Sequence, residues 1–199
     1  MKAASIRHAL RRGTVHAIIG LASAIALFFF SRLSVQVALT AVTAAFLSLE
    51  TARLHVPSLK QSFARWFAPL LRQEEKSKLM GASYFLAGCL ITVLAFPQDI
   101  APLAIIFLSL GDPTATVIGI WKGRTKLWGK SMEGNGACFV VCLLAGSVVA
   151  TLRGEPPLAV AIVGAIFATI FQALPRWLND NLTIPLGAAA AMAVAKILI

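Results

Sequence analysis

Seven long apolar stretches, separated by polar segments, dominate the hydrophobic pattern of this chain. Each stretch is close to the roughly 20 apolar residues that a helix needs to cross the hydrocarbon core of a bilayer. The pattern therefore predicts an all-α, polytopic integral membrane protein with about seven transmembrane helices, forming a single domain over residues 1–199. The predicted spans are approximately residues 14–30, 34–52, 79–97, 100–121, 135–152, 157–174 and 182–199.

The longest polar segment covers residues 53–78 and mixes apolar and basic residues at near-helical spacing over residues 59–72. One interpretation is an interfacial helix that lies against anionic lipid headgroups. The other is a solvated connecting loop, and the pattern favours neither.

Composition supports the membrane interpretation. The chain is 58% hydrophobic and 13% charged, with a mean hydropathy of +0.82, whereas soluble domains carry about 25% charged residues. A net charge of +10 is compatible with nucleic-acid binding. However, the basic residues alternate with apolar runs of membrane length, so we expect the bilayer as the partner and no nucleic acid.

The distribution of basic residues predicts the orientation. If the N-terminus is cytoplasmic, every Lys and Arg, Arg176 included, falls on the cytoplasmic side except Arg32, Arg153 and Lys196. The first stretch ends in residues 28–30, three phenylalanines without a small-residue cleavage site, which favours an anchor over a cleaved signal peptide. We expect the cytoplasmic membrane of a prokaryote, with any active site facing the cytoplasm.

The polar segment 111–134 is the densest candidate site. It begins with the carboxylate Asp112, continues through a loop rich in glycine and lysine, and ends with the carboxylate Glu133. Glycines let a backbone approach phosphate oxygens, and lysines neutralise their charge. Carboxylates hold Mg²⁺ together with phosphates. Pro113 predicts a helix start directly after Asp112, where free N–H groups would favour an anion.

This segment is not a P-loop. Five residues separate Gly123 from Gly129, where that motif needs four, and a membrane span precedes it. Composition alone also leaves open a simpler interpretation, in which Asp112 caps a helix and the lysines only enforce topology.

Three weaker candidates lie elsewhere in the chain. Glu50 and Arg53 are spaced to pair on one helix face, either as a plain ion pair or as part of a site. Arg12 and His16 are four apart near the first span, where His16 has either a structural role or a contact with phosphate. Residues 179–185 form a polar segment between the last two spans. Composition alone favours a loop with a helix cap for this segment.

Taken together, these motifs resemble the membrane family that contains dolichol kinase, phytol kinase and CTP-dependent diacylglycerol kinase, distantly akin to phosphatidate cytidylyltransferase. The family pattern is Asp-x-x-Ala-x-x-x-Gly-x-x-x-Gly, a short gap, then Lys-(Ser/Thr)-x-Glu-Gly. It falls here on Asp112, Ala115, Gly119, Gly123, Lys130, Ser131, Glu133 and Gly134. The weaker matches are Arg12 with His16, Glu50 with Arg53, Glu75 before residues 79–82, and residues 179–186. The resemblance covers about residues 12–186.

The resemblance implies phosphoryl transfer from a nucleoside triphosphate, CTP before ATP, to the hydroxyl of a membrane lipid alcohol, with Mg²⁺. Polyprenol (dolichol), phytol and diacylglycerol are all candidate acceptors. The implied catalytic residues are Asp112, Lys130, Glu133 and Asp180, with Asp112 and Glu133 as metal ligands. The implied nucleotide-binding residues are Ala115, Gly119, Gly123, Arg124, Lys126, Ser131, Gly134 and Asn181. Further candidates are Arg12, His16, Glu50, Arg53 and Glu75.

Two other functions stay open. A phosphatidate cytidylyltransferase would make CDP-diacylglycerol, although this chain is short for that enzyme and lacks its longer C-terminal signature. A transporter would carry ionisable groups near the midplane, often in repeated halves. Here the charges gather at one face and no repeat is visible. The sequence leaves the oligomeric state open.

Overall fold

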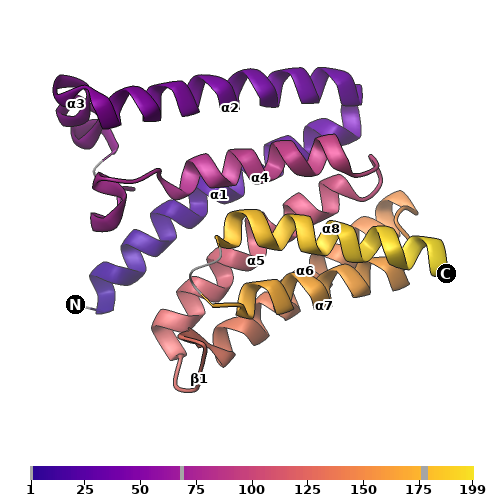
Figure 1. Cartoon of the computed structure of the whole chain (residues 1–199). Coiled ribbons are helices and arrows are strands. Elements are labelled where there is room, and N and C mark those ends of the chain that lie inside the picture. Colours follow the sequence, from indigo (N-terminus) through magenta and orange to yellow (C-terminus); the bar gives the residue numbers. More distant parts are fainter. Residues whose placement is uncertain (1, 68–69, 176–178) are drawn as a thin grey trace.

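The computed structural model describes residues 2–67, 70–175 and 179–199, and the all-α prediction is confirmed (Figure 1). A helix forms in each of the seven predicted stretches. They are α1 (Lys2–Phe29), α2 (Arg32–His55), α4 (Gly81–Ala95), α5 (Ala101–Lys122), α6 (Met132–Arg153), α7 (Leu158–Ala173) and α8 (Asp180–Leu198). Arg176, which entered the orientation argument, lies outside the described residues.

The helices differ in length relative to a bilayer. Helices α1, α2, α5, α6 and α8 are long and apolar enough to cross a membrane. Helices α4 and α7 are apolar but have only 15 and 16 residues. At 1.5 Å per residue they extend about 23 Å, less than the roughly 30 Å of a hydrocarbon core. The polytopic membrane class is confirmed, with two of the seven helices shorter than a full span.

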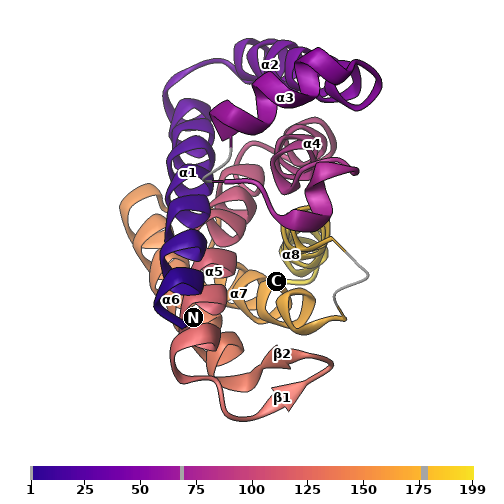
Figure 2. The same ribbon diagram turned by 90° about the vertical axis from the view of Figure 1, so that its left-hand side faces the viewer.

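Helix α5 forms the centre of the bundle. Its first nine residues, 101–109, are all buried, and α1, α6, α7 and α8 pack around it. Helix α2 lies at the outer edge and packs mainly on α4 (Figures 1 and 2). Close contact between α1 and α5 depends on Gly13, where a Cβ atom would lie 2.7 Å from the Cβ of Pro113.

The prediction that a helix starts at Pro113 is wrong. Helix α5 begins at Ala101, with Pro102 in its first turn, and continues through Pro113 to Lys122. Pro113 has no N–H for the carbonyl of Ser109, a loss that helices within a membrane bundle tolerate, and it lies in close contact with Gly13 of α1. Asp112 therefore lies inside a helix, and the free N–H groups expected beside it are not available for an anion.

Two short elements complete the fold. Helix α3 (Pro57–Phe67) and the 3₁₀ helix η1 (Gln73–Lys76) follow α2, so the helical interpretation of the 53–78 segment is confirmed for α3. Strands β1 (Lys126–Leu127) and β2 (Lys130–Ser131) pair antiparallel before α6. Their two-residue turn has φ of 49° at Trp128 and 82° at Gly129, the positive values that tight hairpin turns require.

Candidate functional site

The structure has a cavity of about 1050 Å³ at one end of the helix bundle. Its wall is formed by α1, the 72–81 segment, the start of α4, α5, the hairpin, the start of α6 and the adjoining ends of α7 and α8. These elements meet at the end of the bundle that faces the viewer in Figure 2. The predicted residues that line it are Arg12, His16, Glu75, Asp112, Ala115, Gly119, Lys126, Lys130, Ser131, Asp180 and Asn181. The predicted residues outside its described lining are Glu50, Arg53, Gly123, Arg124, Glu133 and Gly134.

Lys130 is a buried cation in the cavity wall. Its Nζ atom donates to Oδ1 of Asp180 and to the backbone carbonyl of Gln172, both at 2.5 Å. Only 7% of its side chain is exposed, and a charge at such depth needs partners of this kind. The interaction joins the hairpin to the end of α7 and the start of α8.

Asp112 projects from α5 into the same cavity and is half-buried. The charged groups that act on it are Asp180, Lys130, Arg72 and Arg12. Among the described residues, no three His, Cys, Asp or Glu side chains gather as a metal site. Mg²⁺ commonly takes only one or two carboxylates together with phosphate oxygens, and a cavity with Asp112, Asp180 and several cations fits that pattern.

The carboxylate of Glu133 accepts hydrogen bonds from residues near it in the chain. Its carboxylate accepts from the backbone N–H groups of Arg124 (3.0 Å) and Thr125 (3.1 Å) and from the hydroxyl of Ser131 (2.7 Å). Ser131 in turn caps α6 by accepting from the N–H of Gly134 at 3.1 Å. The second carboxylate of the motif thereby holds the loop between α5 and α6 together.

Close packing explains three glycines of the motif. A Cβ atom on Gly119 would lie 3.3 Å from the Cβ of Ser131, and one on Gly123 would lie 2.7 Å from the Ser131 hydroxyl oxygen. A Cβ atom on Gly134 would collide with the carbonyl oxygen of Ala115. These glycines let α5, the hairpin and α6 meet closely, and Gly119 also lines the cavity.

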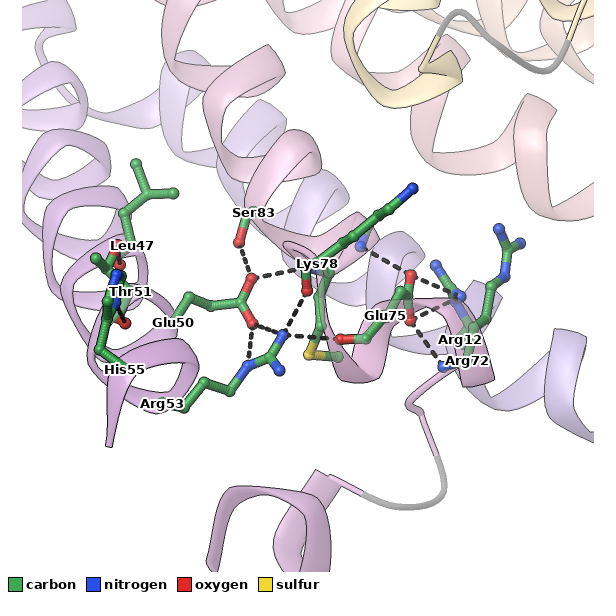
Figure 3. A network of polar contacts seen from close by, with 12 residues as sticks. Arg12, Leu47, Glu50, Thr51, Arg53, His55, Arg72, Glu75, Lys78 and Ser83 are labelled. Atoms are coloured by element: carbon green, nitrogen blue, oxygen red, sulfur yellow. Dashed lines mark hydrogen bonds and ion pairs between the residues drawn. The ribbon is translucent and has the colours of Figure 1, made fainter. Parts of the chain in front are cut away.

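A buried ion pair lies beside the cavity (Figure 3). Glu50 and Arg53 pair on one face of α2 as predicted, with 2.7 Å between Arg53 Nε and Glu50 Oε1. The other carboxylate oxygen of Glu50 accepts from the N–H of Met80 at 2.7 Å and from the hydroxyl of Ser83 at 2.6 Å. Both oxygens of this fully buried carboxylate therefore have partners.

Arg53 connects this pair to the segment that borders the cavity. Its Nη2 atom donates to the carbonyl oxygens of Glu75 at 3.1 Å and Lys78 at 2.9 Å. Its guanidinium lies 4.7 Å from the ring centroid of Phe63 in α3, a cation–π distance. Arg53 thus fixes the backbone of residues 75–78 against α2 and α3.

Glu75 completes the connection to the cavity (Figure 3). Its carboxylate accepts from the N–H groups of Arg72 (2.8 Å) and Gly81 (2.9 Å) and pairs with Arg12 at 3.2 Å. Burial alone would raise the pKa of Glu75, but these two hydrogen bonds and the charges of Arg12 and Arg72 lower it below its ordinary value. Glu75 therefore stays ionised and holds Arg12 at the cavity wall, where the buried His16 stacks on Phe85 at 4.6 Å.

Two buried amides of the cavity wall, and the exposed Arg72, were not predicted from the sequence. Asn135 and Gln172 are buried and line the cavity, yet the Nδ2 atom of Asn135 and the Oε1 atom of Gln172 have no hydrogen-bond partner. The Oδ1 atom of Asn181 is also unpartnered, while its Nδ2 atom donates to the carbonyl of Gly81 at 3.0 Å. Single amides inside apolar spans are the signal that could have found the first two.

The chain is similar to proteins from a bacterium and from fungi. It is 27% identical over 164 residues to an uncharacterized protein of Rickettsia prowazekii, covering 79% of this chain and 80% of that one. It is 25% identical over 164 residues to CTP-dependent diacylglycerol kinase 1 of Schizosaccharomyces pombe, covering 72% of each. It is 28% identical over 105 residues to CTP-dependent diacylglycerol kinase 1 of Eremothecium gossypii, covering 51% of this chain and 33% of that one. No protein-family model and no solved structure matches.

Proposed function

We propose that this protein is a CTP-dependent lipid kinase, with diacylglycerol as the first candidate among the lipid alcohols. The observation that carries the proposal is one cavity, at the end of an apolar helix bundle, that is lined by three carboxylates (Glu75, Asp112 and Asp180) and several cations. Similarity to two CTP-dependent diacylglycerol kinases supports the choice of donor and acceptor.

The cations of the cavity suit a triphosphate. Arg12 of α1, Arg72 of the 72–81 segment, and Lys126 and Lys130 of the hairpin line it. Catalysis of phosphoryl transfer is mostly positioning and neutralisation of charge on the phosphate oxygens. The volume of about 1050 Å³ exceeds that of most single-ligand pockets, which leaves room for a nucleotide and a lipid headgroup together.

In the proposed reaction, the acceptor hydroxyl oxygen forms a bond to the γ-phosphorus and the bond from that phosphorus to the β,γ-bridging oxygen breaks. CDP is released, and the hydroxyl proton passes to a carboxylate. We assign that role to Asp180, because Lys130 holds it in place. Asp112 would hold Mg²⁺, which when bound neutralises phosphate charge. Glu133, the other expected ligand, is assigned to holding the α5–α6 loop.

The lipid alcohol would enter the cavity sideways from the bilayer and present its hydroxyl at the cytoplasmic boundary. The distribution of Lys and Arg along the chain supports that orientation. A site formed by the ends of membrane helices needs no separate soluble nucleotide-binding domain.

The test uses the purified protein in nanodiscs with Mg²⁺, γ-labelled CTP or ATP, and diacylglycerol, polyprenol or phytol. We expect label in phosphatidate when CTP and diacylglycerol are both present. Absence of transfer from either nucleotide to any acceptor would contradict the proposal. Formation of CDP-lipid from phosphatidate and α-labelled CTP would replace it with the cytidylyltransferase.

A further inference from the structure

Asn135 and Gln172 form part of the cavity wall and have no role in the reaction as proposed above. Asn135 lies in the first turn of α6 and Gln172 in the last turn of α7. Their exposed fractions are 6% and 4%, yet each has a side-chain atom without a hydrogen-bond partner. Buried polar groups are nearly always paired, so two unpaired amides lining one cavity indicate a ligand.

The chemistry of the unpaired atoms indicates the kind of ligand. The Nδ2 atom of Asn135 is a donor and the Oε1 atom of Gln172 is an acceptor. A hydroxyl both donates and accepts and carries no charge, so it can satisfy both atoms. Phosphate oxygens only accept and are negatively charged, which suits the cations of the cavity better.

The amides differ from most of the cations of the cavity in how deeply they are buried. Arg72, Lys78 and Lys126 are exposed residues of the cavity lining, whereas Asn135 and Gln172 are buried in it. The carbonyl oxygen of Gln172 and Oδ1 of Asp180 bind the same Nζ atom of Lys130. Gln172 is therefore next to the carboxylate assigned to receive the hydroxyl proton.

We propose that Asn135 and Gln172 bind the hydroxyl of the lipid alcohol and form the acceptor subsite of the cavity. The proposal rests on the lipid-kinase function for the identity of the acceptor. Asn135 donates to the hydroxyl oxygen, and the hydroxyl donates to Gln172 until its proton is transferred.

The first test measures binding without nucleotide, so that it does not depend on catalysis. Labelled diacylglycerol is titrated into wild-type protein in nanodiscs, alongside the matching diacyl-propanediol, which has the same acyl chains and no hydroxyl. We expect the wild type to prefer diacylglycerol by roughly five- to tenfold, the range for one or two hydrogen bonds. Equal affinity for both lipids overturns the subsite. Preference for diacylglycerol without any phosphoryl transfer would overturn the proposed function alone.

The second test replaces each amide by an apolar side chain of similar size, in Asn135→Leu and Gln172→Met. The backbone carbonyl that accepts from Lys130 is retained in Gln172→Met. Because each substitution removes an unpaired buried group, the melting temperature should be maintained or raised. We expect each variant to lose most of the preference for diacylglycerol and to raise its KM roughly fivefold, with the KM for CTP unchanged.

Thr43→Val provides the matched control. Thr43 is 2% exposed and its hydroxyl oxygen is also unpaired, but it lies in α2 and does not line the cavity. The control should leave the KM for diacylglycerol unchanged. If the amide variants instead lose discrimination between CTP and UTP while retaining the wild-type KM for diacylglycerol, the amides contact the base and the proposal is wrong.

Discussion

Two polar regions lie side by side at one end of the bundle and differ in how their groups are paired. In the network of Glu50, Arg53 and Glu75, the protein itself supplies hydrogen-bond partners to both oxygens of each carboxylate (Figure 3). In the adjoining cavity, atoms of Asn135, Gln172 and Asn181 have none. A network completed by the protein stabilises the fold, whereas we propose that the unpaired groups of the cavity wall bind a ligand.

The largest effect is expected from Asp112→Asn. This substitution retains the shape of the side chain but removes the negative charge that we assign to Mg²⁺ binding, so turnover should fall by at least about 10²- to 10³-fold. Membrane insertion and the gel-filtration profile should be unchanged. Phosphatidate formation measured under saturating CTP and diacylglycerol decides the point, and near-normal activity would remove Asp112 as a metal ligand.

Lys130→Ala is expected to have the next largest effect. It removes a buried cation assigned to the triphosphate, together with that cation's ion pair to Asp180, so kcat/KM for CTP should fall by about 10²-fold. Steady-state kinetics with varied CTP measure this change. The matched control is Lys122→Ala, because Lys122 is exposed and does not line the cavity. Equal kinetics in the two variants would refute the phosphate-binding assignment of Lys130.

Glu50→Gln tests the network of Glu50, Arg53 and Glu75, in which the protein supplies the hydrogen-bond partners. The substitution leaves the buried guanidinium of Arg53 without its counter-charge, which should cost about 3–5 kcal/mol of stability. The activity of the folded fraction should fall less than in Lys130→Ala. Thermal melting and activity per folded molecule are measured together. A stable Glu50→Gln protein with no activity would instead place Glu50 in the reaction.

The smallest expected effect is the pH dependence that Glu75 contributes. Because its pKa is lowered on folding, its contribution to stability is fully present above its ordinary pKa of 4.5. That contribution is lost as the pH falls through the lowered value. The difference in melting temperature between wild type and Glu75→Gln should therefore be largest near neutral pH and shrink in acid. A difference that grows in acid would contradict this account.

The sequence predicted the fold well because helix-length apolar runs are a local property of the chain. All seven stretches form helices, and the Glu50–Arg53 pair follows from helical spacing alone. The helix start predicted at Pro113 was wrong because α5 already begins at Ala101 and continues through Pro113, which packs against Gly13, a residue distant in sequence.

The candidate site was predictable where residues share a motif and not where the wall is assembled from several helices. Asp112 and Lys130 belong to one segment of the chain and line the cavity as a set. Asn135 and Gln172 come from separate spans, and no spacing relates them. Glu133 faces its own loop because the N–H groups of Arg124 and Thr125 point toward it, and sequence spacing does not specify that backbone path.

The most direct test of the central claim, that the cavity is a nucleotide site, is calorimetric titration of the protein in nanodiscs with CTP in the absence of acceptor lipid. We predict one CTP per chain, tighter binding with Mg²⁺, competition by CDP, and markedly weaker binding in Lys130→Ala but not in Lys122→Ala. Absence of CTP binding to the wild type, or equal affinity in the two lysine variants, would contradict the account.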